Sequence, residues 1–135
     1  MTYNARTPHP YARGELVIVI DVSDLERAGV FWSQVLGYVR EGEASNRYLS
    51  LIPADGNGCE VLLQKVPDDK HGKNRLHLDL RTPDLQAEVS RVLDLGATVL
   101  TAHPIVEFGW TWQVLADPDD NEFCVLQPPR PTRQP

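Results

Sequence analysis

Residues 74–99 read NRLHLDLRTPDLQAEVSRVLDLGATV, and this stretch decides the fold. Leucines at positions 76, 78 and 80 alternate with His77, Asp79 and Arg81. A period of two is typical of a strand that has one buried face. The segment therefore predicts a strand over 76–81 whose other face carries an imidazole, a carboxylate and a guanidinium.

A helix is predicted directly after this strand. Thr82 stands where an N-cap residue is expected, and Pro83 follows at the first helical position. Apolar residues then recur at helical spacing, namely Leu85, Val89, Val92 and Leu93. Gly96 is a residue that tolerates the left-handed conformation in which many helices end.

The same pattern occurs once earlier, in residues 15–40, which read ELVIVIDVSDLERAGVFWSQVLGYVR. A strand over 16–22 is followed by a capping box, with Ser23 as the N-cap and Glu26 as its reciprocal partner. Gly37 ends this helix as Gly96 ends the other. Two copies of one unit, offset by about sixty residues, predict two modules with pseudo-two-fold symmetry.

Each module is predicted to have the order β-α-β-β-β in an α+β fold. The remaining strands are expected over 38–43, 47–52 and 59–66 in the first module and over 97–101, 110–116 and 122–127 in the second. Residues 103–109 are expected to form a loop. We expect an N-terminal arm at 1–13, a domain at 14–128 with modules at 14–67 and 74–128, and a flexible tail at 129–135.

The composition argues against several classes of protein. The net charge of −6 does not suit nucleic-acid binding, which needs a clustered basic surface. No apolar run approaches the length of a membrane span, and the N-terminus lacks the apolar core of a secretory signal. Two cysteines, Cys59 and Cys124, make no disulfide framework. We therefore expect reduced thiols, a cytoplasmic location, and neither a nucleic-acid nor a membrane partner.

Two motifs add a family resemblance to this pattern. The ending WQVLADPDDNEFCVLQPP (residues 112–129) and the segment KNRLHLDL (residues 73–80), together with the repeated module, resemble the glyoxalase/bleomycin-resistance/dioxygenase group, the vicinal oxygen chelate superfamily. The resemblance implies curved sheets around a shared cleft, and often a homodimer. It also implies that catalytic members bind a divalent metal in that cleft.

The resemblance further implies one metal ligand from each of four strands. The histidine position of the second module falls on His77, whereas that of the first falls on Val17, which has no donor atom. The final carboxylate position falls on Cys124, and Glu60 is the acid nearest the remaining position. Because only His77 and Glu60 are then ligands of the family's type, we expect no tightly bound catalytic metal and no cofactor. A zinc site made by His77, Glu60 and Cys124 is the alternative.

His77 and Asp79 form the candidate catalytic pair. A carboxylate close to an imidazole can orient it and raise its basicity. In the alternative, His77 is a hydrogen-bonded residue of a polar cleft and Asp79 pairs with an arginine or lysine across the sheet.

The candidate ligand pocket consists of Trp110, Trp112, Glu60 and Cys124. The two tryptophans share one strand face, and aromatic walls suit flat organic ligands. The alternatives are structural: the tryptophans fill the core, Glu60 is a solvated or paired acid, and Cys124 is a small buried hydrophobe.

Three functions are compatible with these residues. The first is a glyoxalase-like lyase or isomerase that acts on a small metabolite with a degenerate metal site. The second is a metal-free protein that sequesters a drug or metabolite, as bleomycin-resistance members do. The third is a protein without chemistry that uses the fold for dimerisation. The first two expect a small-molecule ligand, and we expect a homodimer.

Overall fold

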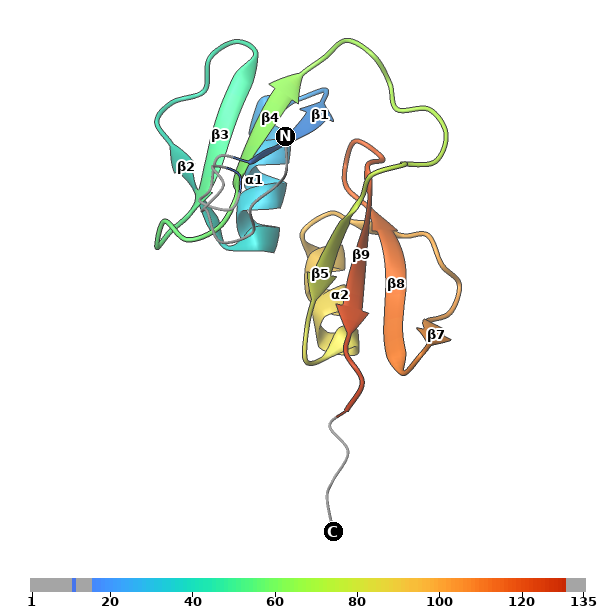
Figure 1. Ribbon diagram of the computed structural model, residues 1–135. Helices are drawn as coiled ribbons and strands as arrows, with labels where there is room; N and C mark the ends of the chain where they lie inside the picture. The colour runs from blue at the N-terminus through green and yellow to red at the C-terminus, as the bar shows by residue number, and fades with distance from the viewer. Residues whose placement is uncertain (1–10, 12–15, 131–135) are drawn as a thin grey trace, which may run out of the picture. The chain divides into compact units, whose positions relative to one another are not determined.

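The computed structural model describes residue 11 and residues 16–130, and its contacts divide the chain into two compact units, Met1–Asp68 and Asp69–Pro135. Each unit combines one helix with one sheet, which confirms the predicted α+β fold of two related modules (Figure 1). The predicted arm, apart from Tyr11, and the tail, apart from residues 129 and 130, lie outside the described residues.

The first unit has the predicted β-α-β-β-β order. Its elements are β1 (Val17–Val22), α1 (Leu25–Leu36), β2 (Tyr38–Glu41), β3 (Tyr48–Pro53) and β4 (Glu60–Lys65). The strand order in the sheet is β1-β4-β3-β2, with β1 and β4 parallel and the other pairs antiparallel. A parallel pair needs a long crossover connection, and α1 with the two strands after it supplies one.

The core of the first unit lies between α1 and its sheet. Phe31 and Trp32 pack edge to face on the helix, with ring centroids 5.1 Å apart. Both are buried where α1 contacts β3 and β4, and the strand leucines Leu49, Leu51 and Leu63 are buried as well. Trp32 is therefore a core residue of the first unit, as its place in the helical apolar pattern indicates.

The helix caps differ from the prediction by one or two residues. The N-cap of α1 is Asp24 instead of Ser23, and its side chain accepts a hydrogen bond from the backbone N–H of Arg27 at 3.0 Å. Asp84 caps α2 (Leu85–Asp94) in the same way, and Thr82 instead accepts the backbone N–H of Asp84 at 3.2 Å. A carboxylate one or two residues closer to the first turn reaches the exposed N–H groups, so the predicted capping residues, Ser23 and Thr82, precede the cap.

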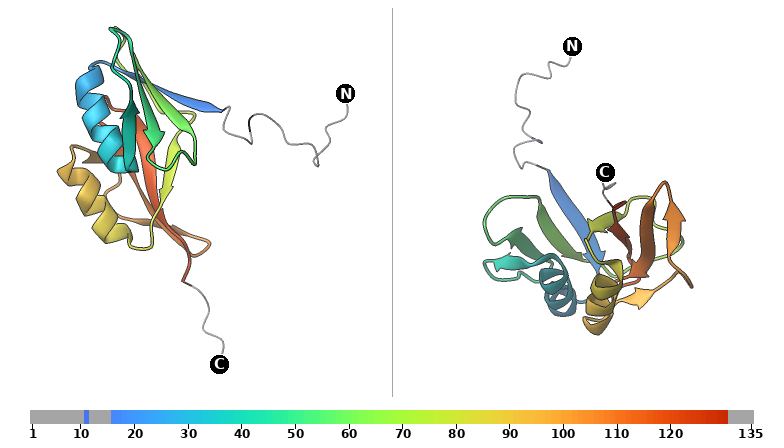
Figure 2. Two further views of the ribbon diagram at one scale, coloured as in Figure 1. Left: turned by 90° about the vertical axis from the view of Figure 1, so that its left-hand side faces the viewer. Right: turned by 90° about the horizontal axis from the view of Figure 1, so that it is seen from below.

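The second unit repeats the topology with one additional strand. Its elements are β5 (Leu78–Arg81), α2, β6 (Thr98–Val99), β7 (Ile105–Glu107), β8 (Trp110–Ala116) and β9 (Glu122–Gln127). The order β5-β9-β8-β6 corresponds to that of the first unit. The strand β7 pairs with the first three residues of β8, 110–112. Each helix lies against one face of its own sheet (Figure 2). No helix among the described residues is long and apolar enough to cross a membrane.

Two predictions for the second unit need correction. The strand predicted from residue 76 begins at Leu78, and Leu76 is 91% exposed, so the start of the alternating pattern lies outside the sheet. The predicted loop 103–109 contains β7. Phe108 and Gly109 both have positive φ, 51° and 81°, which is the conformation of the tight two-residue hairpins that turn one strand directly into the next.

Candidate functional site

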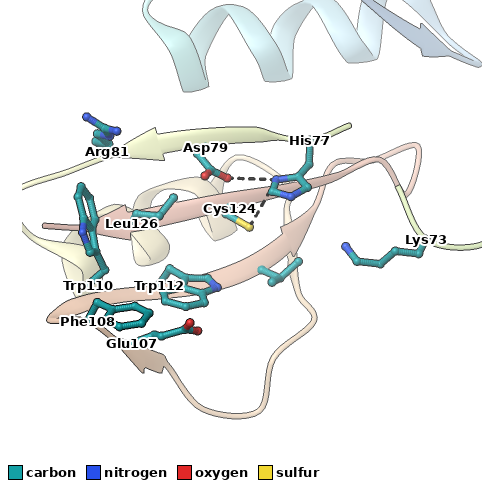
Figure 3. Close-up of a pocket in the computed structure, with 11 residues that line it drawn as sticks. Lys73, His77, Asp79, Arg81, Glu107, Phe108, Trp110, Trp112, Cys124 and Leu126 are labelled. Atoms are coloured by element: carbon teal, nitrogen blue, oxygen red, sulfur yellow. Dashed lines mark hydrogen bonds and ion pairs between the residues drawn. The ribbon is translucent and has the colours of Figure 1, made fainter. Parts of the chain in front are cut away.

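A pocket of about 510 Å³ opens on the sheet of the second unit, on the face that α2 does not cover (Figure 3). Alternation along the strands explains this placement. Phe123 and Val125 of β9 are buried, while Cys124 and Leu126 between and beside them line the pocket. The residues that line the pocket are Lys73, His77, Asp79, Arg81, Glu107, Phe108, Trp110, Trp112, Val114, Cys124 and Leu126.

Strand register gives the pocket three chemically distinct parts. Arg81 of β5 pairs with Leu126 of β9, which pairs with Trp112 of β8. The next row across the same strands is Asp79, Cys124 and Val114. The strand β5 therefore provides a polar edge, β9 an apolar floor, and β8 an aromatic wall.

The polar edge contains a direct contact between His77 and Asp79. The Nδ1 atom of His77 lies 3.1 Å from Oδ1 of Asp79, and Sγ of Cys124 lies 4.0 Å from the same Nδ1. Residues two apart in a regular strand are about 7 Å apart, so the pattern alone does not predict this contact. It forms because His77 precedes β5 and its backbone is not held in the sheet. Asp79 pairs with this histidine instead of with an arginine or lysine across the sheet.

Cys124 is held as a neutral thiol. Burial raises its pKa to about 11, and the charge of Asp79 and a hydrogen bond with that carboxylate add to the effect. At neutral pH the sulfur therefore carries its proton and is a weak nucleophile. In the arrangement found here, Cys124 forms part of the pocket floor and stands close to the His77–Asp79 pair.

Arg81 and Trp110 close one end of the pocket. The guanidinium carbon lies 5.1 Å from the centroid of the Trp110 ring, within the range of a cation–π contact. Trp110 and Trp112 point from β8 toward the same space, with Phe108 beside them (Figure 3). The structure brings together His77, Asp79, Trp110, Trp112 and Cys124 from the candidate set.

A comparison with known families gives a match over most of the chain. Residues 17–126 match the glyoxalase-like domain family. The chain belongs to this family. The curated protein Glyoxalase 1 of Caenorhabditis elegans is 26% identical over 118 residues, which cover 82% of this chain and 41% of that protein. The chain thus spans less than half the length of this relative.

Solved structures show the same fold at low sequence identity. A glyoxalase/bleomycin resistance protein/dioxygenase family enzyme from Burkholderia phytofirmans PsJN has a TM-score of 0.68 at 19% identity, covering 82% of this chain and 95% of that one. The fosfomycin resistance protein FosX from Listeria monocytogenes, solved with Mn(II) and a sulfate ion, has a TM-score of 0.69 at 16% identity, covering 85% and 90%.

The second unit of this glyoxalase-like protein brings together a set of donor atoms by itself. Glu60 lies in β4 of the first unit, where its carboxylate accepts a hydrogen bond from Ser50 at 2.8 Å, and its place in the ligand pocket stays a prediction. Within the second unit, donor atoms of His77, Asp79 and Cys124 lie within 4.8 Å of one another. A nitrogen, an oxygen and a sulfur suit a zinc-like ion better than manganese, which prefers oxygen ligands.

A further cluster fixes the chain segment that leads to His77. The Glu122 carboxylate accepts hydrogen bonds from Lys73, from Lys70 at 3.2 Å and from the backbone N–H of Asn74 at 3.3 Å. The Lys73 hydrogen bond, followed by those from Lys70 and Asn74, lowers the pKa of Glu122 to about 2 against the opposing effect of burial. Glu122 therefore acts as an anchor for the segment before β5.

Six residues that line the pocket are absent from the candidate set predicted from the sequence, namely Lys73, Arg81, Glu107, Phe108, Val114 and Leu126. Glu107 and Phe108 fall in the predicted loop, because the three exposed residues of β7 show no alternating pattern. Gly109 is the feature of the sequence that could have indicated this hairpin. It stands between two runs of residues that favour strands, where a glycine is compatible with a tight turn.

Proposed function

We propose that this protein binds a small organic molecule in the pocket of its second unit. The observation that supports the proposal is the convergence of a polar edge, an apolar floor and an aromatic wall on one space of about 510 Å³. Ligand sites have this composition, with few polar groups that orient the ligand and mostly apolar groups that bury it. Trp112 and Leu126 would contact the ligand's flat surface, and His77 and Asp79 its polar atoms.

In the catalytic form of this proposal, the protein is a lyase or isomerase. Asp79 orients the His77 ring through Nδ1, which leaves the other ring nitrogen as the atom that accepts or returns a proton of the ligand. Roughly two fifths of the His77 side chain is exposed, at 39%, so a ligand can reach it. In the alternative form, the same contacts sequester a drug or metabolite without chemistry.

The second candidate is metal-assisted chemistry, and the cluster of His77, Asp79 and Cys124 favours it. These three residues would hold a zinc-like ion, which polarises an oxygen atom of a bound ligand when present. Cys124 would have to lose its proton for this, against a pKa of about 11. The expectation that the protein retains no tightly bound metal therefore stays a prediction.

The experiment combines elemental analysis of the dialysed protein with a thermal-shift screen of a small-molecule library. We expect compounds that raise the melting temperature of the wild type, since a ligand that binds only the folded state stabilises it. His77→Ala and Trp112→Ala should each reduce the shift. His103→Ala is the matched control, because His103 is an exposed histidine of the same unit outside the pocket.

Each result separates the candidates. Stabilisation without metal supports a metal-free pocket. About one equivalent of zinc that is lost in His77→Ala and in Asp79→Asn supports the metal-assisted site. The proposal is wrong if hits stabilise His77→Ala, Trp112→Ala and the wild type equally, because the ligand then binds elsewhere.

A further inference from the structure

Among the residues that the structure describes, charge pairing leaves one cation of the pocket, Arg81, without an acidic partner. Lys73 is bound to Glu122, and the imidazole of His77 contacts Asp79. Arg81 contacts the ring of Trp110 but has no ion-pair partner among the residues that the structure describes. The unmatched positive charge therefore stands at one end of the polar edge.

The cation–π contact with Trp110 also limits how the guanidinium can turn. An arginine held against an aromatic face keeps its plane while its N–H donors remain at the rim. Those donors form a planar fork, which matches the two oxygens of a carboxylate. Arg81 is thus prepared to bind a planar anion with little loss of side-chain freedom.

The spacing across the sheet defines what lies next to that anion. Arg81, Leu126 and Trp112 occupy one row on three neighbouring strands. Neighbouring strands are about 4.8 Å apart, so Arg81 and Trp112 originate about 10 Å apart, with an apolar side chain between them. A flat aromatic acid bound to the Arg81 guanidinium could therefore lay its rings on the apolar floor at Leu126 and against the Trp112 indole, which line the same pocket.

We propose that the pocket selects a planar aromatic carboxylate, with the carboxylate on Arg81 and the rings between Leu126 and Trp112. This inference rests on the proposed small-molecule pocket and specifies its ligand class. It runs against the overall charge of −6, which attracts cations. Glu107, an acid on the exposed strand β7, also lines the pocket and would attract a cation. Preferential binding of a cationic aromatic ligand is therefore the competing outcome.

The test uses 2-naphthoate, its uncharged analogue 2-naphthamide, and the cation 2-naphthylmethylammonium, titrated calorimetrically at one ionic strength. We expect 2-naphthoate to bind at least about tenfold more tightly than the amide, as a charge-assisted pair of hydrogen bonds would give. Arg81→Gln should remove this difference and leave the affinity for the amide nearly unchanged. Arg75→Gln is the matched control, because Arg75 is an exposed arginine of the same unit outside the pocket.

Four results would overturn the inference. The first two are equal affinity for acid and amide, and a preference for the acid that survives in Arg81→Gln. The other two are tighter binding of the cation that is lost in Glu107→Gln, and a lack of naphthoate binding at millimolar concentration. The proposed pocket itself would survive each of these results if any probe or library compound binds the wild type and loses affinity in Trp112→Ala.

Discussion

Asn74 and Glu122 hold each other by two hydrogen bonds that join the segment before β5 to the start of β9. The backbone N–H of Asn74 donates to the Glu122 carboxylate, and the side-chain oxygen of Asn74 accepts the backbone N–H of Glu122, both at 3.3 Å. With Lys70 and Lys73 on the same carboxylate, this contact fixes the chain three residues before His77. The position of the imidazole in the pocket therefore depends on the ionised state of Glu122.

The first prediction concerns the stability of the fold in acid. The folded-state pKa of Glu122, about 2, lies below its ordinary value of 4.5, so its contribution to stability is complete above pH 4.5. That contribution is lost as the pH falls from about 4.5 toward 2. The free energy of unfolding in urea should thus be lower for Glu122→Gln than for the wild type at pH 6, and the two values should converge as the pH falls. If the difference in the free energy of unfolding between the two proteins stays constant down to pH 2.5, the ionised Glu122 does not anchor this segment.

The second prediction concerns the reactivity of Cys124. In a Cys59→Ser background, the native thiol should react with a disulfide reagent far more slowly at pH 8 than after unfolding, because its pKa is about 11. Asp79→Asn removes the carboxylate charge that raises this pKa, so the reaction at pH 9 should become faster. Asp94→Asn, at an exposed position on α2, is the control and should change nothing. Equal rates in all three proteins would disprove the coupling between Asp79 and Cys124.

The third prediction concerns the packing of α1. A Cβ atom at Gly29 would lie 2.5 Å from Cδ2 of the buried Leu49 and 3.2 Å from Nη2 of Arg40. Gly29→Ala should destabilise the protein by about 1–3 kcal/mol through overpacking, despite the gain of about 1 kcal/mol in helix propensity. Leu49→Val should relieve the clash, so the double variant should be more stable than the sum of the single changes predicts. If the changes in stability of the two single variants, measured from their urea midpoints, simply add up in the double variant, Leu49 is not the residue with which the methyl group added by Gly29→Ala clashes.

Much of this fold follows from the sequence because strong periodic patterns coincide with clear turns. Residues 110–116 and 122–127 were predicted as strands, and β8 and β9 have these bounds. The helix caps were placed wrongly because Thr82 and Asp84 are both good cap residues, and only the three-dimensional turn decides between them. The strand β7 was missed because its side chains are all exposed and only its pairing with β8 defines it.

The site was less predictable than the fold, for a geometric reason. The sequence identifies His77, Asp79 and Arg81 as one polar strand face, but it does not show that His77 lies before β5 and turns toward Asp79. The row of Arg81, Leu126 and Trp112 depends on the register between strands far apart in the chain. Such contacts become visible only when the pairing of β5, β9 and β8 is known.

The fourth prediction concerns the oligomeric state. On β1, Val17 and Val19 are 39% and 51% exposed, on the opposite strand face from the buried Val22. An apolar strip of this kind on a sheet favours association, and we expect a homodimer of twice the 15.2 kDa chain mass. Sedimentation equilibrium at micromolar concentration tests this, and Val19→Glu should shift the equilibrium toward the monomer. A wild type that sediments as a monomer would contradict the prediction.

The most direct test of the proposed pocket uses the three tryptophans as reporters. Trp110 and Trp112 line the pocket, whereas Trp32 is 1% exposed in the core of the first unit and serves as an internal control. The measurement is a ¹H–¹⁵N spectrum of the indole N–H groups, assigned by Trp→Phe variants, during titration with 2-naphthoate or 2-naphthamide. We predict saturable shifts of the Trp110 and Trp112 signals and an unchanged Trp32 signal. If both probes and the library compounds that stabilise the protein leave Trp110 and Trp112 unshifted, or move all three signals alike, the second unit does not contain the binding site.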